Sequence, residues 1–314
     1  MNYSVIMPCF NEAHVLPQSL ASICKAIGER KDVELLVLDN GSTDQSVAIA
    51  ESFGAEVRSL PNLKIAALRN QGAALSHGKY LLFLDADVQV PENWLDKIDQ
   101  YVQQQTADVV GFVDDVPADA PWFARIWGLR ARARRQTLRP IDSLPGRNLF
   151  VSREWFDKVS GFSETLRTGE DKDFVMRLKN AGAAVLTDPS LDMIHLGFER
   201  DFAEWCRKEY WRQHSHLALM DQQGITLRLL RFPILSVCHL LWLVVVIAMI
   251  LMCCGQWLLL TLVLWWLPSL AMSLVNPLSR APLSVLLQFT LLYWLRFHIT
   301  GYSVIREFWE RQTR

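Results

Sequence analysis

The sequence lacks the motifs of several common enzyme classes. It has no Gly-x-Gly-x-x-Gly and no Walker loop, which argues against a Rossmann dehydrogenase and a P-loop enzyme. Its six cysteines have neither the spacing of a metal site nor a disulfide framework, which fits a reducing compartment. The net charge of -1 gives no bulk attraction to nucleic acid, so we expect no nucleic-acid partner.

Charged side chains are missing from one long stretch near the carboxyl end. Between Phe232 and Ser279 there is no Asp, Glu, Lys or Arg, and these roughly 48 residues are more than twice what one bilayer span needs. We predict two transmembrane helices, at about 233–252 and 257–275, joined by a turn at 254–256. A channel or transporter would be expected to have charged residues within its spans or an internal repeat. The two predicted spans have neither, so the hairpin is interpreted as an anchor.

The flanks of this stretch predict its orientation. Arg228 and Arg231 precede it and Arg280 follows it, which places both ends in the cytosol by the positive-inside rule. No signal peptide opens the chain, so we expect a multi-pass protein of the cytoplasmic (inner) membrane whose amino-terminal part faces the cytosol. The apolar segment after residue 281 is short and is interrupted by Arg296 and His298; we predict an interfacial or re-entrant helix at about 281–303. The domains are then 1–222 and 223–314.

Before the membrane region, short apolar runs alternate with helical patterns. Strands are expected at 4–7, 33–38, 56–58, 80–84 and 109–113, and the helices between them include 15–27 and 65–76. Ser42 and Gln45 have the spacing of a capping box, and Pro91 suits the first turn of the next helix. This alternation predicts an α/β fold with a doubly wound, mostly parallel sheet.

Polar side chains follow three of the predicted strands. Asn11 and Glu12 follow the strand at 4–7, Asp39 follows the strand at 33–38, and the strand at 80–84 leads into Asp85 and Asp87. Because the carboxyl ends of parallel strands lie along one edge, these groups should converge on one crevice. Two carboxylates one residue apart repel each other unless a cation joins them, and a divalent ion with oxygen ligands fits that need. By itself the pair would also suit a turn with two solvated aspartates.

The region from Val109 to Leu196 gives weaker signals. Trp122 to Thr137 looks helical and is rich in arginine, as a solvated face would be, or a surface that meets lipid headgroups or an acceptor phosphate. Glu170 and Asp171 precede a helix at 172–180, where acidic residues complement the helix dipole or could serve as a general base. His195 follows a strand-like run and is, by itself, more often structural than a ligand.

Five motifs together resemble those of family 2 glycosyltransferases, over about Ser4 to Leu196. They are Ser4 to Glu12, Asp39 to Asp44, Arg69 to Gly72, Leu84 to Asp87 and Gly169 to Asp171, in that order along the chain. The resemblance implies a GT-A fold with a Rossmann-like mixed sheet. It also implies inverting transfer from a nucleotide-sugar donor, of hexosyltransferase type, with a Mg²⁺ or Mn²⁺ ion at an Asp-x-Asp motif.

The resemblance also implies roles for single residues. Asp171, with Glu170 beside it, matches the catalytic base. Asp85, Asp87 and His195 match the metal ligands, and Gln89 is a further candidate because polyprenyl-phosphate sugar synthases have Asp-x-Asp-x-Gln. The residues assigned to the nucleotide-sugar are Pro8, Phe10, Asn11, Glu12, Asp39, Arg69, Asp85, Ala86 and Asp87. On the acceptor side we place Gly146, Asn148 and Arg212.

The sequence departs from the processive polysaccharide synthases of this family. The Gln-x-x-Arg-Trp motif is absent, and Tyr210 to His214 has similar residues in another arrangement. We therefore expect transfer of one sugar to a lipid-linked or membrane-proximal acceptor, as in the assembly of a cell-envelope polysaccharide or a glycolipid. The alternatives are a polyprenyl-phosphate glycosyltransferase and an inactive nucleotide-binding scaffold.

Overall fold

The computed structural model describes residues 1–133, 137–141, 143–214, 216–252, 255–275 and 281–313. The chain forms two compact units. The sheet unit comprises Met1–Ala118, Arg135–Thr165 and Glu170–Phe198, and the helical unit comprises Asp119–Arg134, Leu166–Gly169 and Glu199–Arg314. A domain boundary at residue 222 stays a prediction of the sequence.

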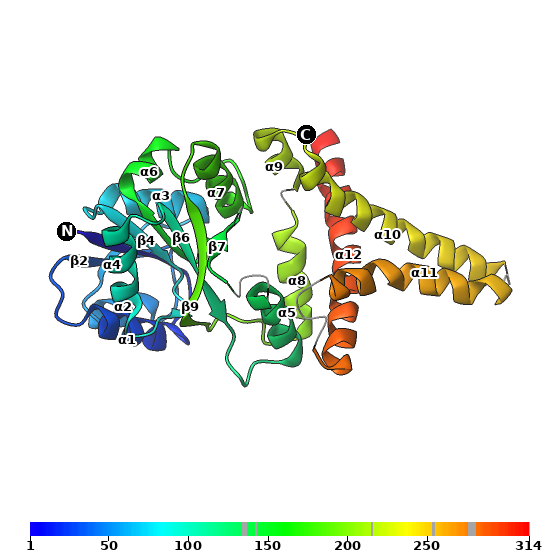
Figure 1. The fold of residues 1–314 in the computed structure, drawn as a ribbon, viewed down its shortest axis with the longest axis horizontal. Coiled ribbons are helices and arrows are strands. Elements are labelled where there is room, and N and C mark those ends of the chain that lie inside the picture. Colours follow the sequence, from blue (N-terminus) through cyan, green and yellow to red (C-terminus); the bar gives the residue numbers. More distant parts are fainter. Residues whose placement is uncertain (134–136, 142, 215, 253–254, 276–280, 314) are drawn as a thin grey trace. The chain divides into compact units, whose positions relative to one another are not determined.

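The sheet unit consists of one mixed sheet with helices on both faces (Figure 1). Its strands are β1 (Tyr3–Cys9), β2 (Val33–Asp39), β3 (Glu56–Ser59), β4 (Tyr80–Leu84), β5 (Val88–Gln89), β6 (Val109–Asp115), β7 (Arg139–Pro140), β8 (Asn148–Ser152) and β9 (Val185–His195). Its helices are α1 (Leu16–Ile27), α2 (Ser46–Ser52), α3 (Ile65–Leu75), α4 (Trp94–Gln104), α6 (Arg153–Lys158) and α7 (Glu170–Asn180).

The strand order is β3-β2-β1-β4-β8-β6-β9-β5, and β7 pairs with β9 outside this path. Strands β1 to β4 are parallel to one another, as the alternating pattern predicts. Strand β8 is antiparallel to both β4 and β6, and β5 is antiparallel to β9. The sheet is therefore mixed, and the antiparallel pairs bring the later strands to the edge where β1, β2 and β4 end.

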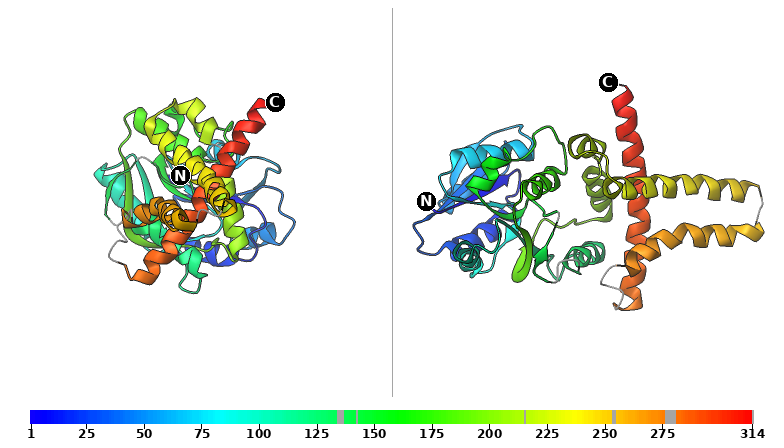
Figure 2. Two further views of the ribbon diagram at one scale, coloured as in Figure 1. Left: turned by 90° about the vertical axis from the view of Figure 1, so that its right-hand side faces the viewer. Right: turned by 45° about the horizontal axis from the view of Figure 1, so that its top comes forward.

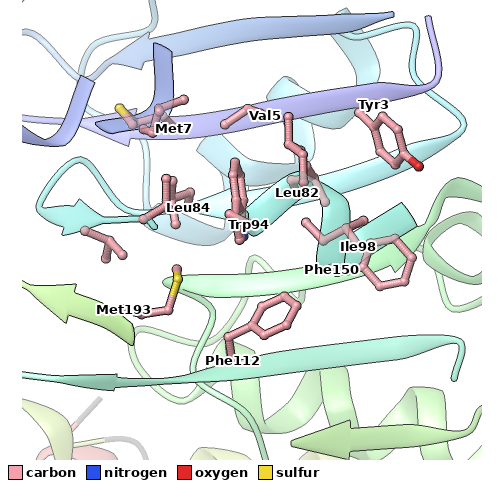
Figure 3. Close-up of a cluster of buried hydrophobic side chains, with 14 of the residues drawn as sticks. Tyr3, Val5, Met7, Leu82, Leu84, Trp94, Ile98, Phe112, Phe150 and Met193 are labelled. Carbon is pink, nitrogen blue, oxygen red and sulfur yellow. The ribbon is translucent and has the colours of Figure 1, made fainter. Parts of the chain in front are cut away.

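The two faces of the sheet carry separate hydrophobic cores because side chains alternate along a strand. Val5 and Met7 of β1 face the core under α1, α2 and α4, where Leu82, Trp94 and Phe112 also pack (Figure 3). Ile6 faces the core under α3, α6 and α7. All these side chains are buried, as expected for strands that helices cover on both faces.

Three helix starts differ from their sequence patterns. The predicted capping box is wrong: α2 begins at Ser46, and the hydroxyl oxygen of Ser42 accepts a hydrogen bond from the Asn11 amide instead (2.9 Å). Helix α4 begins at Trp94, after Pro91 rather than at it. Helix α7 begins at Glu170, so the acidic pair lies in its first turn.

The helical unit contains α5 (Trp122–Ala133), α8 (Phe202–Arg212), α9 (His216–Gln223), α10 (Leu227–Leu251), α11 (Gly255–Leu274) and α12 (Leu283–Gln312). Helices α10 and α11 form a hairpin, and α12 runs crosswise at its base (Figure 2). Residues 229–251 and 255–274 are long and apolar enough to cross a membrane, with mean hydropathies of 2.8 and 1.8. Only 17% and 22% of their most apolar windows are buried, unlike the core helix of a soluble protein.

The predicted spans thus correspond to two helices, although α10 starts several residues earlier than expected. Residues 253–254 of the predicted turn lie outside the described residues, and Gly255 and Gln256 begin α11. The segment expected at 281–303 is part of a single helix that continues to Gln312.

Candidate active site

The loops after β1 and β2 are joined by hydrogen bonds. Asn11 has a positive φ of 56°, which asparagine tolerates better than most residues, and its Oδ1 accepts from the Thr43 amide (2.8 Å). The Glu12 amide donates to the hydroxyl of Ser46 (2.9 Å). Buried Asp39 accepts from the amides of Gly41 (3.1 Å) and Ser42 (3.0 Å), so its carboxylate shapes the loop. These hydrogen bonds join the loop after β1 to the loop after β2, and we call the edge that the two loops form the rim.

A cavity of about 200 Å³ opens at this rim. Its lining residues come from the ends of β1, β2 and β4 and from the start of α3: Pro8, Cys9, Phe10, Glu12, Asn40, Ile65, Leu68, Asp85, Ala86 and Asp87. The volume is below the range of about 300–1,000 Å³ usual for ligand pockets, so it suits a small group or one part of a larger ligand. Cys9, Asn40, Ile65 and Leu68 were not predicted; the last two are ordinary apolar positions in a helical pattern.

Arg69 connects the β4 edge to α7. It is 3% exposed, and it donates to Asp85 Oδ1 through Nη2 and to Glu170 Oε1 through Nη1, both at 2.9 Å. Gly146 leaves room for the guanidinium, since a Cβ there would lie 2.7 Å from Nη1. Arg69, predicted to bind the nucleotide, thus pairs with two carboxylates, and it brings Asp85 and Glu170, which are 85 positions apart in the sequence, to one place.

Asp87 lies against the end of β9. His195 Nε2 is 3.3 Å from its Oδ2, and the Leu196 amide donates to its backbone carbonyl (2.7 Å). Gly197 leaves room for this carboxylate, because a Cβ at position 197 would lie 1.7 Å from Oδ2 and displace it. Burial acts to raise the pKa of Asp87, but His195 and then Arg147 outweigh it and hold that pKa below its usual value. The carboxylate is therefore held in its charged form.

Arg147, which the sequence did not single out, is the second guanidinium of the site. It pairs with Asp114 through both Nε and Nη2, and its charge also acts on Asp85 and Asp87. Its carbonyl accepts from the Asp85 amide (3.0 Å). Asp114 lies at the bulge where the pairing of β6 with β9 shifts register. Only the antiparallel pairing of β8 with β4 brings Arg147 here, so no local pattern could have found it.

Glu170 and Asp171 lie in different surroundings although they are neighbours. Glu170 is buried on Arg69, and burial raises its pKa, with a further contribution from Asp171 that Arg69 partly opposes. Asp171 is half-buried, and its Oδ2 accepts from the Gly146 amide (3.3 Å). The Asp171 side chain thus lies beside the loop that carries Arg147.

Three predicted site residues have partners elsewhere. Asn148 is buried and donates to the Phe112 carbonyl within the sheet (3.2 Å). Gln89 lies on β5 and accepts from Gln18 of α1 (3.2 Å). Arg212 belongs to the helical unit, where it pairs with Glu199 and Glu209. Their roles in metal or acceptor binding stay predictions.

The residues at the rim fit a divalent cation. Asp87 Oδ1 is buried without a hydrogen-bond partner among the described residues, and oxygen and imidazole donors suit Mn²⁺, with Mg²⁺ preferring the oxygens. Five linked carboxylates (Asp85, Asp87, Asp114, Glu170 and Asp171) face two guanidinium groups, and a diphosphate would add negative charge. Within the described residues, however, no three or more His, Cys, Asp or Glu side chains already form a metal cage. A metal would need substrate oxygens as further ligands.

The chain is similar in sequence to known glycosyltransferases. The chain is 27% identical over 236 residues to "Glycosyltransferase AglE" of Haloferax volcanii, covering 72% of this chain and 76% of that protein. It is 32% identical over 158 residues to "Undecaprenyl-phosphate 4-deoxy-4-formamido-L-arabinose transferase" of Enterobacter sp. (strain 638), covering 46% of this chain but only 44% of that one.

One solved structure shares the fold over almost the whole chain. The mannosyltransferase PcManGT of Pyrobaculum calidifontis, solved in complex with GDP-Man and Mn²⁺, has a TM-score of 0.63 at 17% identity and covers 98% of this chain and 87% of its own. The mixed sheet is that of GT-A glycosyltransferases. Residues 4–160, half of the chain, match the model of the family described as "Glycosyl transferase family 2". The chain belongs to glycosyl transferase family 2.

Proposed function

We propose that this protein is a membrane-anchored, inverting glycosyltransferase of hexosyltransferase type that moves one sugar from a nucleotide-sugar to a lipid-linked or membrane-proximal acceptor. The observation that carries the proposal is that Arg69 joins Asp85, which lines the cavity just after β4, to Glu170 at the start of α7. Family membership supports the reaction class, and the solved relative with GDP-Man and Mn²⁺ supports a nucleotide-sugar donor.

Asp87, Asp85 and His195 are the residues that would hold a Mg²⁺ or Mn²⁺ ion. When bound there, the ion would neutralise charge on the departing nucleoside diphosphate, which lowers the barrier by several kcal/mol. Asp39, Asn11 and Glu12 shape the rim on which the nucleotide would lie, and Phe10, which is 54% exposed at the cavity, offers an aromatic face. Pro8 and Ala86 complete the wall.

Asp171 is our choice for the general base, because it is the more accessible carboxylate of the α7 pair. It would take the proton from the acceptor hydroxyl as that oxygen attacks the anomeric carbon, a contribution of roughly 10²–10⁴-fold. Glu170 would hold Arg69, and through it Asp85, in position. One displacement with one base inverts the anomeric configuration.

Membrane attachment is supported by the two apolar helices, and the arginines at 228, 231 and 280 support a cytosolic catalytic domain at the cytoplasmic membrane. The acceptor could also be a polyprenyl phosphate itself. The 32% identical undecaprenyl-phosphate transferase and the Asp-x-Asp-x-Gln spacing at Asp85, Asp87 and Gln89 favour that second candidate.

The test is a product assay on the full chain in lipid vesicles. We would supply a panel of UDP- and GDP-sugars with Mn²⁺, Mg²⁺ or EDTA, and either polyprenyl phosphate or a polyprenyl-diphosphate-sugar as acceptor. Mass spectrometry should show one added sugar, lost with EDTA and of inverted anomeric configuration. Transfer to polyprenyl phosphate would select the second candidate. No transfer from any donor, together with no nucleotide binding, would contradict both.

A further inference from the structure

Helix α12 has an apolar face without Asp, Glu, Lys or Arg, exposed near both ends of the helix. We define the apolar stripe as Leu283, Leu287, Leu291, Tyr302, Ile305 and Trp309, which are 37–69% exposed. Successive members are three or four residues apart, except for the step of 11 residues, about three helical turns, from Leu291 to Tyr302. They therefore lie on one side of the helix. The charged residues of α12, from Arg296 to Arg311, all fall outside this side.

The opposite face of α12 is packed against the rest of the helical unit. Phe289 and Tyr293 contact the ring of Trp127 in α5, with centroids 6.2 Å and 5.7 Å away. Arg296 pairs with Glu209 of α8 at 3.2 Å. The carboxylate of Glu307 accepts from two amides at the start of α9. This face is therefore already occupied by protein.

The α10–α11 hairpin leaves from the same side as the apolar stripe. Between Leu291 and Tyr302, the ring of Trp294 stacks on Trp266 of α11 (5.1 Å). Gly301 allows a close crossing with α10, since a Cβ there would lie 2.6 Å from the Ser236 carbonyl oxygen. The hairpin covers the middle of the stripe and leaves both ends bare, and α12 runs crosswise to it (Figure 2).

We propose that the apolar stripe of α12 lies on the surface of the lipid bilayer that receives the hairpin, so that α12 is an interfacial helix in the plane of the membrane. The inference rests on the membrane anchoring proposed above. A bilayer entered by α10 and α11 necessarily meets whatever flanks them on the same side, and here that surface is apolar with an aromatic end at Tyr302 and Trp309. A spanning α12 would instead place Arg296 and Glu307 in the hydrocarbon and separate them from α8 and α9.

The experiment uses the full chain in vesicles of phosphatidylcholine and phosphatidylglycerol, with the photoreactive residue p-benzoylphenylalanine at single positions. The test positions are Leu287 and Ile305. Val244, exposed on the hairpin, is the positive control, and Asp221 of α9 is the exposed control on the polar side. Arg306 is a matched neighbour of Ile305 off the stripe. After irradiation, mass spectrometry quantifies lipid adducts.

We expect adducts at Leu287 and Ile305 at about the level of Val244, with yields about tenfold lower at Asp221 and clearly reduced at Arg306. Adducts at Val244 without adducts at Leu287 and Ile305 would overturn the inference and leave the anchor standing. Crosslinks to a second chain at these positions would assign the stripe to a dimer instead. Equal labelling of Arg306 and Ile305 would indicate a spanning helix. No lipid adduct at any position, Val244 included, would contradict membrane anchoring itself.

Discussion

Both units of this protein bury charged side chains, but they balance them differently. In the helical unit, Glu199 and Glu209 are matched by Arg212 and Arg296, and the four groups pair with one another. In the sheet unit, five carboxylates from the ends of β4 and β6 and the start of α7 share two guanidinium groups and the His195 imidazole, and a cavity opens beside Asp85 and Asp87. Burial of charge alone does not identify a site. An excess of one sign beside a cavity points to a site, because a ligand of the opposite sign would relieve the repulsion among the buried groups.

The largest expected effect is at Asp87. Replacing it by asparagine removes a charge that would bind the metal, so kcat/KM should fall by about 10³-fold or more, in line with several kcal/mol of charge stabilisation. Titration with Mn²⁺ followed by nucleotide binding should show the loss directly. Asp96→Asn, on the exposed side of α4, is the control and should behave as wild type. Unchanged Mn²⁺ dependence in Asp87→Asn would remove the proposed metal ligand.

Asp171→Asn should lower kcat by about 10²–10⁴-fold because the acceptor proton then has no base. Donor binding should be nearly unaffected, since Asp85, Asp87 and Arg69 stay in place. Isothermal titration with the nucleotide and single-turnover rates separate the two quantities. Asp157→Asn, exposed in α6, is the matched control. A variant with normal kcat would exclude Asp171 as the base and leave Glu170 as the candidate.

In the helical unit, substitution of a buried charged residue should lower the free energy of unfolding rather than the catalytic rate. Glu209→Gln leaves Arg296 without its counter-charge, which should lower the free energy of unfolding by about 3–5 kcal/mol. Glu204→Gln, in the same helix but in an ion pair that is 28% and 38% exposed, should change it by less than about 1 kcal/mol. Thermal unfolding of the full chain in detergent measures both. Equal effects would contradict the distinction between the two kinds of pair.

The smallest expected effect is a gain of stability at the site itself. The pKa of Glu170 is raised in the folded state, so the folded state binds the proton more tightly than the unfolded chain does. The contribution of Glu170 is therefore full below its ordinary pKa of 4.5 and is lost as pH rises through the raised pKa. Glu170→Gln should lack this decline and unfold at a higher temperature than wild type at neutral pH.

Melting curves of both proteins between about pH 4 and pH 8 test the prediction for Glu170. Glutamine can still accept from Arg69, so the geometry is retained. A variant that is less stable than wild type at neutral pH would show that the Arg69 pair outweighs burial at this position.

The sequence was sufficient for the elements with clear local patterns. The early strands, the two apolar helices and the carboxylates at the strand ends are where their patterns predict, because hydrophobic runs and abrupt polar stops are local properties. Arg147 and Asp114 were missed because their meeting depends on the antiparallel pairing of β8 and on the bulge in β9. The capping box failed because a distant amide, that of Asn11, competes for the Ser42 hydroxyl.

The two hydrogen bonds of Arg69 make this position a poor target for substitution. A single ammonium group could not reach Asp85 and Glu170 in the same way as a planar guanidinium, so even Arg69→Lys would disturb both carboxylates at once. Kinetic data from such a variant would combine the effect of a displaced Asp85 with that of a displaced Glu170. Attempts to change which ligand the cavity prefers are better directed at Ile65 and Leu68, which border the cavity and have no ionic side chain.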